Sequence, residues 1–92
     1  MSERIKTLHP EGKKGVNIEK EKYEQIKAAI LGAIENTGQI SYSDMNKFIK
    51  AQLHKSFDGS IPWYVETVKL DLEARGIIER IPNTSPQMLI IK

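Results

Sequence analysis

The residues that could carry out chemistry in this chain are few and widely separated. It contains no cysteine and two histidines, His9 and His54, neither of which has the spacing to another histidine or a carboxylate that a zinc site or a nucleophile–base pair requires. Acidic pairs such as Asp71 and Glu73 are two residues apart on an expected helix, so they point to different sides and cannot share a proton. The sequence therefore predicts no enzyme, no metal site and no cofactor, and it shows no sign of a small-molecule ligand.

Lysines gather in two parts of the chain where they could meet phosphates. Lys13 and Lys14 are adjacent in a basic N-terminal arm, which we place at residues 1–17, and Lys47 and Lys50 lie on the outer face of an expected second helix. For the second group, an ordinary solvated helix surface is the plainer interpretation, and it stays open. The net charge of +2 on 92 residues is too small to indicate a nucleic-acid partner by itself.

The composition is that of one small globular domain, with 39% hydrophobic and 28% charged residues. Without cysteine, packing alone must hold the core, and dimerisation would help it. No apolar run approaches the roughly 18 residues needed to span a bilayer, and the N-terminus lacks the apolar core of a signal peptide. We expect a cytoplasmic protein that does not contact membranes.

Hydrophobic periodicity predicts two helices in the first part of the domain, which we place at residues 18–92. The first begins at about Asn17, which caps it, and stops at Gly38. The second has a clear start signal, because Ser41 and Asp44 stand in capping-box spacing. The residues expected to be buried recur at helical spacing: Tyr23, Ile26, Ile30, Ala33 and Ile34 in the first helix, and Met45, Phe48, Ile49, Leu53 and Phe57 in the second.

A third helix is predicted to begin with Ser60 as its cap and Pro62 in its first turn, and to stop at Gly76. It carries two apolar stripes on opposite faces, namely Ile61, Val65, Val68 and Leu72 on one and Trp63, Thr67, Leu70 and Ala74 on the other. One stripe packs on the first two helices. The other needs a separate cover, which could be the arm, the hairpin or a second copy of the chain.

Two strands are predicted after the third helix. A β-branched run at residues 77–81 and an aliphatic run at residues 88–91 are joined by an uncharged turn at residues 82–87. Because both runs are apolar on both faces, further cover is expected from an arm, a partner or a short third strand near Gln39 and Ile40. The predicted class is α+β, mostly α, with three helices followed by a C-terminal β-hairpin.

The run LDLEARGIIERIP, which crosses from the third helix into the hairpin, resembles the same junction in MarR-type regulators. Residues 18–92 as a whole resemble the winged helix-turn-helix superfamily, and the full chain is similar to small uncharacterised bacterial families of that fold. The resemblance implies a winged helix in which the third helix and the hairpin, or wing, approach DNA.

From this resemblance we expect a protein that binds double-stranded DNA, acting in transcription regulation as a homodimer. The third helix would enter the major groove, where the contacting residues would be Tyr64, Thr67, Lys69 and Arg75. Phosphates would be bound by Lys47, Lys50, Arg80, Lys13 and Lys14.

The charges of the third helix leave a second hypothesis open. Residues 60–76 contain two basic and three acidic side chains, and the expected wing tip is uncharged, so neither element is suited to phosphate contact. Alternatively, the domain is a protein-interaction module without DNA binding, serving dimerisation or an adaptor role, with its contact surface at Trp63 and Leu70. That hypothesis predicts self-association or a partner that buries Trp63.

Overall fold

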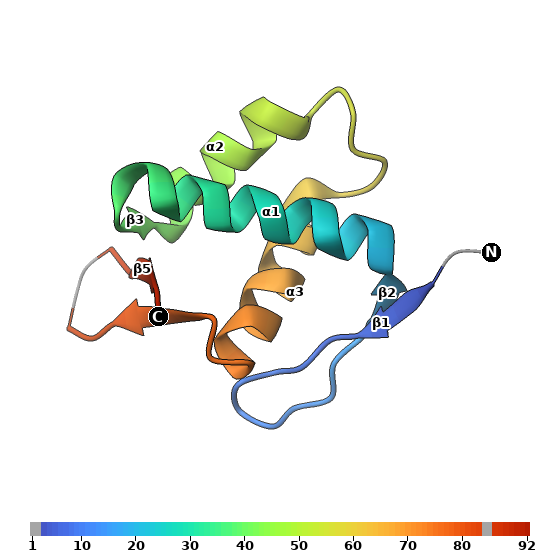
Figure 1. Cartoon of the computed structure of the whole chain (residues 1–92), viewed down its shortest axis with the longest axis horizontal. Coiled ribbons are helices and arrows are strands. Elements are labelled where there is room, and N and C mark those ends of the chain that lie inside the picture. Colours follow the sequence, from blue (N-terminus) through green and yellow to red (C-terminus); the bar gives the residue numbers. More distant parts are fainter. Residues whose placement is uncertain (1–2, 84–85) are drawn as a thin grey trace.

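A computed structural model of the chain describes residues 3–83 and 86–92. Three helices form its centre, α1 (Lys20–Thr37), α2 (Tyr42–Leu53) and α3 (Ile61–Ala74), and together they hold about half of the chain. Small antiparallel sheets lie on two sides of the helices (Figure 1). The predicted α+β class, with three helices followed by a hairpin, is confirmed.

The C-terminal sheet has three strands, β3 (Ile40–Ser41), β4 (Ile78–Ile81) and β5 (Met88–Ile91). β5 lies in the middle and pairs antiparallel with both neighbours, so Leu89 stands opposite Ile40 on one side and Arg80 on the other. The predicted short third strand near Ile40 is therefore present. Residues 84–85 of the predicted turn lie outside the described residues.

The second sheet belongs to the N-terminal arm. β1 (Arg4–Lys6) pairs antiparallel with β2 (Asn17–Glu19), which leads directly into α1. The prediction that Asn17 caps the first helix is wrong, because its side-chain oxygen accepts a hydrogen bond from Arg4 Nε at 3.1 Å instead. Pairing with β1 holds residues 17–19 in a strand, so α1 begins at Lys20.

The other predicted helix ends show which local signals hold. Ser41 Oγ accepts a hydrogen bond from the backbone amide of Asp44 at 3.1 Å, which confirms the cap of α2. Gly38 ends α1 at a φ of 82° and donates its amide to Ile34 O at 2.7 Å, as expected of a helix stop. By contrast, the Ser60 side chain makes no capping hydrogen bond at the start of α3.

The core lies between the three helices and the inner face of the C-terminal sheet. All five residues of the predicted α1 stripe are buried, and so is the Ile61 stripe of α3; Ile78 and Leu89 close the core from the sheet. The prediction for Phe48 is wrong, because this side chain is 40% exposed. It lines a surface hollow between α1 and α2 where its neighbours on α1, Ala28 and Gly32, are too small to cover it.

Candidate nucleic-acid interface

The candidate interface is the outward face of α3. The stripe around Val65 and Val68 is buried in the core, which turns the opposite stripe toward solvent. Trp63 is 46% exposed there, and Thr67 and Leu70 are half-buried. The two predicted stripes are thus real, and the second is only partly covered.

A buried carboxylate, Asp71, connects α3 to two other parts of the chain. It is completely buried, and it accepts hydrogen bonds from the hydroxyl of Tyr23 in α1 at 2.5 Å and from the backbone amide of Leu8 at 2.8 Å. Arg75 Nε donates to both of its oxygens, at 2.9 and 3.0 Å. These bonds raise the pKa of Arg75 above its ordinary value, so the guanidinium keeps its positive charge.

A second buried ion-pair cluster removes Lys69 from the outward face. Lys69 is only 3% exposed; its Nζ lies 3.7 Å from Glu73 Oε1 and 4.8 Å from the centre of the Tyr42 ring. Arg80 binds the same carboxylate with two hydrogen bonds of 2.7 and 3.1 Å, which raise the pKa of Arg80. The prediction that Lys69 reads bases in the major groove is therefore wrong, because α2 and the sheet cover it.

Tyrosines line the two sides of α3. On one side, the Tyr42 hydroxyl donates a hydrogen bond to the Glu66 carboxylate. On the other, Tyr64 packs edge-on against Phe57 and Trp63, with ring centres 5.0 and 4.8 Å apart. Lys22 of α1 lies over the Tyr64 ring at 5.5 Å, so Tyr64 faces α1 rather than the centre of the outward face.

Alkaline pH should weaken the fold through two of these tyrosines. Burial, and then the hydrogen bond to Glu66, raise the pKa of Tyr42 from 10.0 to about 12; burial and Asp71 also raise the pKa of Tyr23 far above its usual range. The folded protein holds both protons more tightly than the unfolded chain, so this stabilisation is complete below about pH 10 and is lost as the pH rises through the folded-state values. We expect the free energy of unfolding to fall above about pH 10.

Tyr42→Phe should make that fall shallower between about pH 10 and 12, as measured by urea unfolding at a series of pH values. Ultraviolet titration of tyrosinate would give the folded-state pKa directly. An unchanged slope in the Tyr42→Phe variant would contradict this role.

Exposed lysines lie beside the two ends of α3 rather than on the helix itself. Lys47 and Lys50 line a surface hollow together with Ile61 and Pro62, which form the first turn of α3. Within residues 3–83 and 86–92, no carboxylate lies within ion-pair distance of either lysine. Both remain available for an anion beside the start of the helix.

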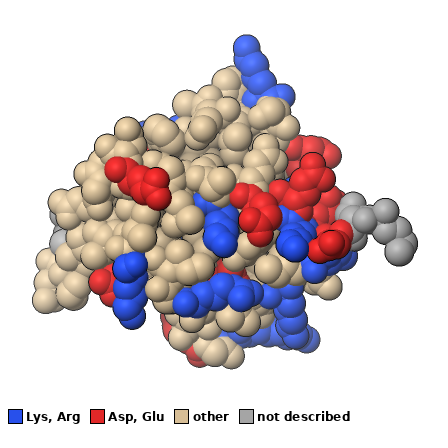
Figure 2. Space-filling view, in the orientation of Figure 1, with Lys and Arg blue, Asp and Glu red and all other residues tan. Residues whose placement is uncertain are grey.

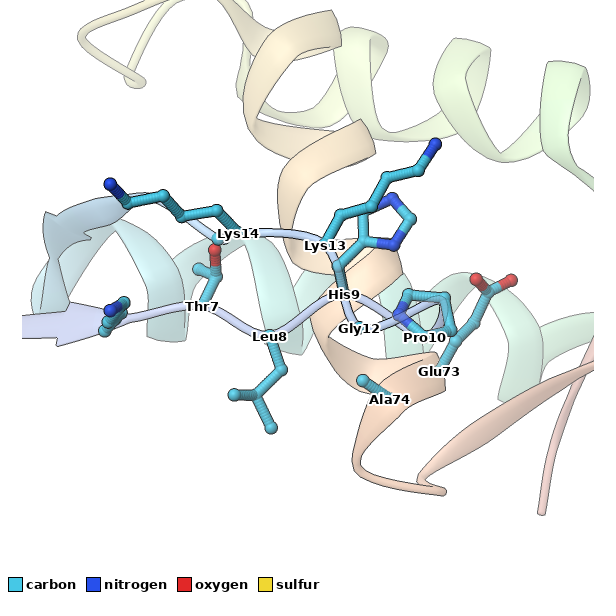
Figure 3. A pocket seen from close by; sticks show the side chains of 11 residues that line it. Thr7, Leu8, His9, Pro10, Gly12, Lys13, Lys14, Glu73 and Ala74 are labelled. Carbon is cyan, nitrogen blue, oxygen red and sulfur yellow. The ribbon is translucent and has the colours of Figure 1, made fainter.

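The second basic group lies in the N-terminal loop, residues 7–16, which connects β1 to β2 and runs beside the last turn of α3 (Figure 1). Lys13 and Lys14 line a hollow of about 530 Å³ whose opposite wall is Glu73 and Ala74 (Figure 3). Figure 2 shows basic side chains along the lower edge, where this loop lies, with a few acidic ones among them, whereas much of the rest of that face is uncharged.

Sequence reasoning missed the residues that organise this site. In the sequence, Asp71 and Glu73 are only two acidic residues on different sides of the third helix, yet one anchors the N-terminal loop and the other neutralises Lys69. The available signal was their spacing, because each has an opposite charge four residues away on the same helix, at Arg75 and Lys69. No local pattern indicates that either carboxylate is covered.

Residues 3–83 and 86–92 give no sign of a metal site or a membrane span. Among the residues described, no three histidine, cysteine or acidic side chains are grouped so that they could hold a metal ion. No helix in the described part of the chain is long and apolar enough to cross a membrane.

Comparison with known proteins places the chain in a family. The model of a family of unknown function (DUF6958) matches residues 4–89, which include every helix and nearly every strand residue described above. No curated protein and no solved structure matches the chain.

Proposed function

Since the chain belongs to the DUF6958 family of unknown function, we propose its function from its own geometry: it is a winged-helix protein that binds double-stranded DNA mainly through phosphate contacts. The order of elements supports the fold. A helix, a short strand and two further helices are followed by a hairpin whose last strand pairs with that short strand. In a winged helix this order leaves the third helix free to enter a groove, with the hairpin beside it.

The observation that carries the proposal is the placement of exposed lysines at both ends of α3. Lys47 and Lys50 lie beside its first turn, and Lys13 and Lys14 lie in the loop beside its last turn. The helix is about 20 Å long, and the major groove is about 12 Å wide, so a helix placed across the groove would bring the two groups toward opposite backbones. Phosphates on both sides of one groove are the ligand that this spacing fits.

Base reading by α3 should be weak. Arg75 and Arg80 bind carboxylates of α3, and Lys69 is buried, so the helix offers Trp63, Glu66 and Thr67 to the groove instead of free cations. Binding energy would therefore come from counterion release, which depends little on sequence. We propose a DNA-binding protein of low sequence selectivity; a role in transcription regulation as a homodimer remains part of this proposal.

The test is the salt dependence of binding to a random-sequence duplex, measured by fluorescence anisotropy. We expect binding at low salt and a steep fall in log K against log salt concentration. The double variant Lys47→Gln/Lys50→Gln should lower the slope by about 2. The control Lys27→Gln removes a cation of α1 that lies over the Tyr23 ring, and it should leave the slope unchanged.

One observation favours the second candidate function, a protein-interaction surface. Trp63 is 46% exposed at the outward face, and Leu70 of the same stripe is half-buried. Exposed tryptophan is typical of interface centres. If the wild-type protein does not bind duplex at low salt and instead sediments as a dimer that Trp63→Ala dissociates, this function replaces DNA binding.

A further inference from the structure

We propose that the N-terminal loop, residues 7–16, is a preformed phosphate-contacting element that Asp71 holds beside the end of α3, and that Lys13 and Lys14 contact separate phosphates of one DNA backbone. This inference rests on the proposed function and extends it, because it gives the loop a wing-like role beside the last turn of α3. Three features of the loop carry it.

The first feature is that the loop is closed at its base. The Thr7 amide donates to Val16 O at 2.8 Å, and the Val16 amide donates to Thr7 Oγ1 at 3.0 Å. Between these residues, Gly15 comes so near the Thr7 carbonyl that an added Cβ would lie 1.7 Å from its oxygen. Only glycine permits this approach, so the closed base depends on residue type and is a built structure.

The second feature is the attachment of the loop to α3. The Leu8 amide donates to Asp71 Oδ1 at 2.8 Å, across 63 positions of sequence, and Tyr23 holds the other carboxylate oxygen. A free loop of this length would lose considerable conformational entropy on binding a ligand. Because Asp71 fixes the loop before binding, that loss is smaller.

The third feature is the charge of the hollow between the loop and α3. Lys6, Lys13 and Lys14 line it, and the only acidic residue among the described lining residues is Glu73, which already binds Lys69 and Arg80. Glu11 lies 3.5 Å from Lys13, but both side chains are about two-thirds exposed, so water and salt screen this pair.

The directions of the Lys13 and Lys14 side chains indicate whether the ligand is a nucleic-acid strand or a single free phosphate. In Figure 3, Lys13 and Lys14 leave the loop in opposite directions rather than converging on one point. Such a pair cannot enclose one free phosphate, but it can contact two phosphates along a strand. Duplex DNA, and not a free anion, is therefore the ligand we assign to the loop.

The experiment compares salt slopes for a duplex. Lys13→Gln/Lys14→Gln should lower the slope by about 2, and Lys13→Arg/Lys14→Arg should restore it. Gly15→Ala keeps both lysines but opens the loop, and it should weaken duplex binding about three- to tenfold while exposing the Leu8 amide to hydrogen exchange. Circular dichroism would verify that the helices of each variant are intact.

Each result supports or overturns the inference. If wild-type protein binds duplex and Lys47→Gln/Lys50→Gln lowers the slope but Lys13→Gln/Lys14→Gln does not, the loop has no such role; duplex binding then stands, but without phosphate contacts at the last turn of α3. Saturable inorganic phosphate binding that shifts the Lys13 and Lys14 amide resonances at millimolar concentration would show a free-anion site instead. Absence of duplex binding by the wild type would overturn the inference and the proposed function together.

Discussion

Asp71→Ala is expected to lower the free energy of unfolding by about 3 kcal/mol or more, because one completely buried carboxylate serves three partners. Its removal leaves the Tyr23 hydroxyl and the Leu8 amide without an acceptor, and each such group costs about 1–3 kcal/mol when it stays buried. Arg75 contributes less, since its side chain is 36% exposed and can turn to water. Urea unfolding of the wild type and the variant, fitted with one shared m-value, measures this change in the free energy of unfolding.

Two further variants make the Asp71 result specific. Asp71→Asn keeps the shape of the side chain and an acceptor for Leu8 but loses the charge that Arg75 binds, so its effect should be smaller than that of alanine. Glu79→Ala removes an exposed carboxylate from β4 and should change stability by no more than about 0.5 kcal/mol. A loss below about 1 kcal/mol for Asp71→Ala would show that its partners find other acceptors.

The elements of the fold could be predicted where their signals are local. The Ser41 cap and the Gly38 stop each depend on residues within about one helical turn, and successive residues of the α1 stripe are at most four positions apart; all three are confirmed. The start of α1 could not be found in this way, because residues 17–19 look like a cap and first turn. They form a strand because they pair with Arg4–Lys6, which lies more than ten positions earlier in the chain.

The candidate site was harder to predict because burial of charge is a tertiary property. A helical wheel places Lys69 and Asp71 at the borders of the buried stripe. At these positions a side chain can be either exposed to solvent or covered by another element. Tyr42 and Arg80 cover one side, and Leu8, 63 positions away, reaches the other. The sequence therefore indicated which residues lie on α3, but not which of its charges remain free.

Removing the charge of Glu73 should lower the free energy of unfolding much more than removing the charge of Lys69. Glu73→Gln should lower the free energy of unfolding by about 3–5 kcal/mol, since it leaves the buried Lys69, beside the Tyr42 ring, without its carboxylate. Lys69→Met should change it by no more than about 1 kcal/mol. Glu73 then keeps both hydrogen bonds from Arg80, and the methionine side chain can pack on the same ring.

The double variant Lys69→Met/Glu73→Gln completes the cycle and should recover much of the stability that Glu73→Gln loses, because no buried lysine remains without a carboxylate. Equal losses from the two single variants would contradict the buried arrangement, since they would mean that each charge depends equally on the other. Lys69→Met also tests the interface. A lysine that α2 and the sheet cover cannot reach a phosphate, so this variant should leave the salt slope for duplex binding unchanged, whereas a lysine in the groove would lower the slope by about 1.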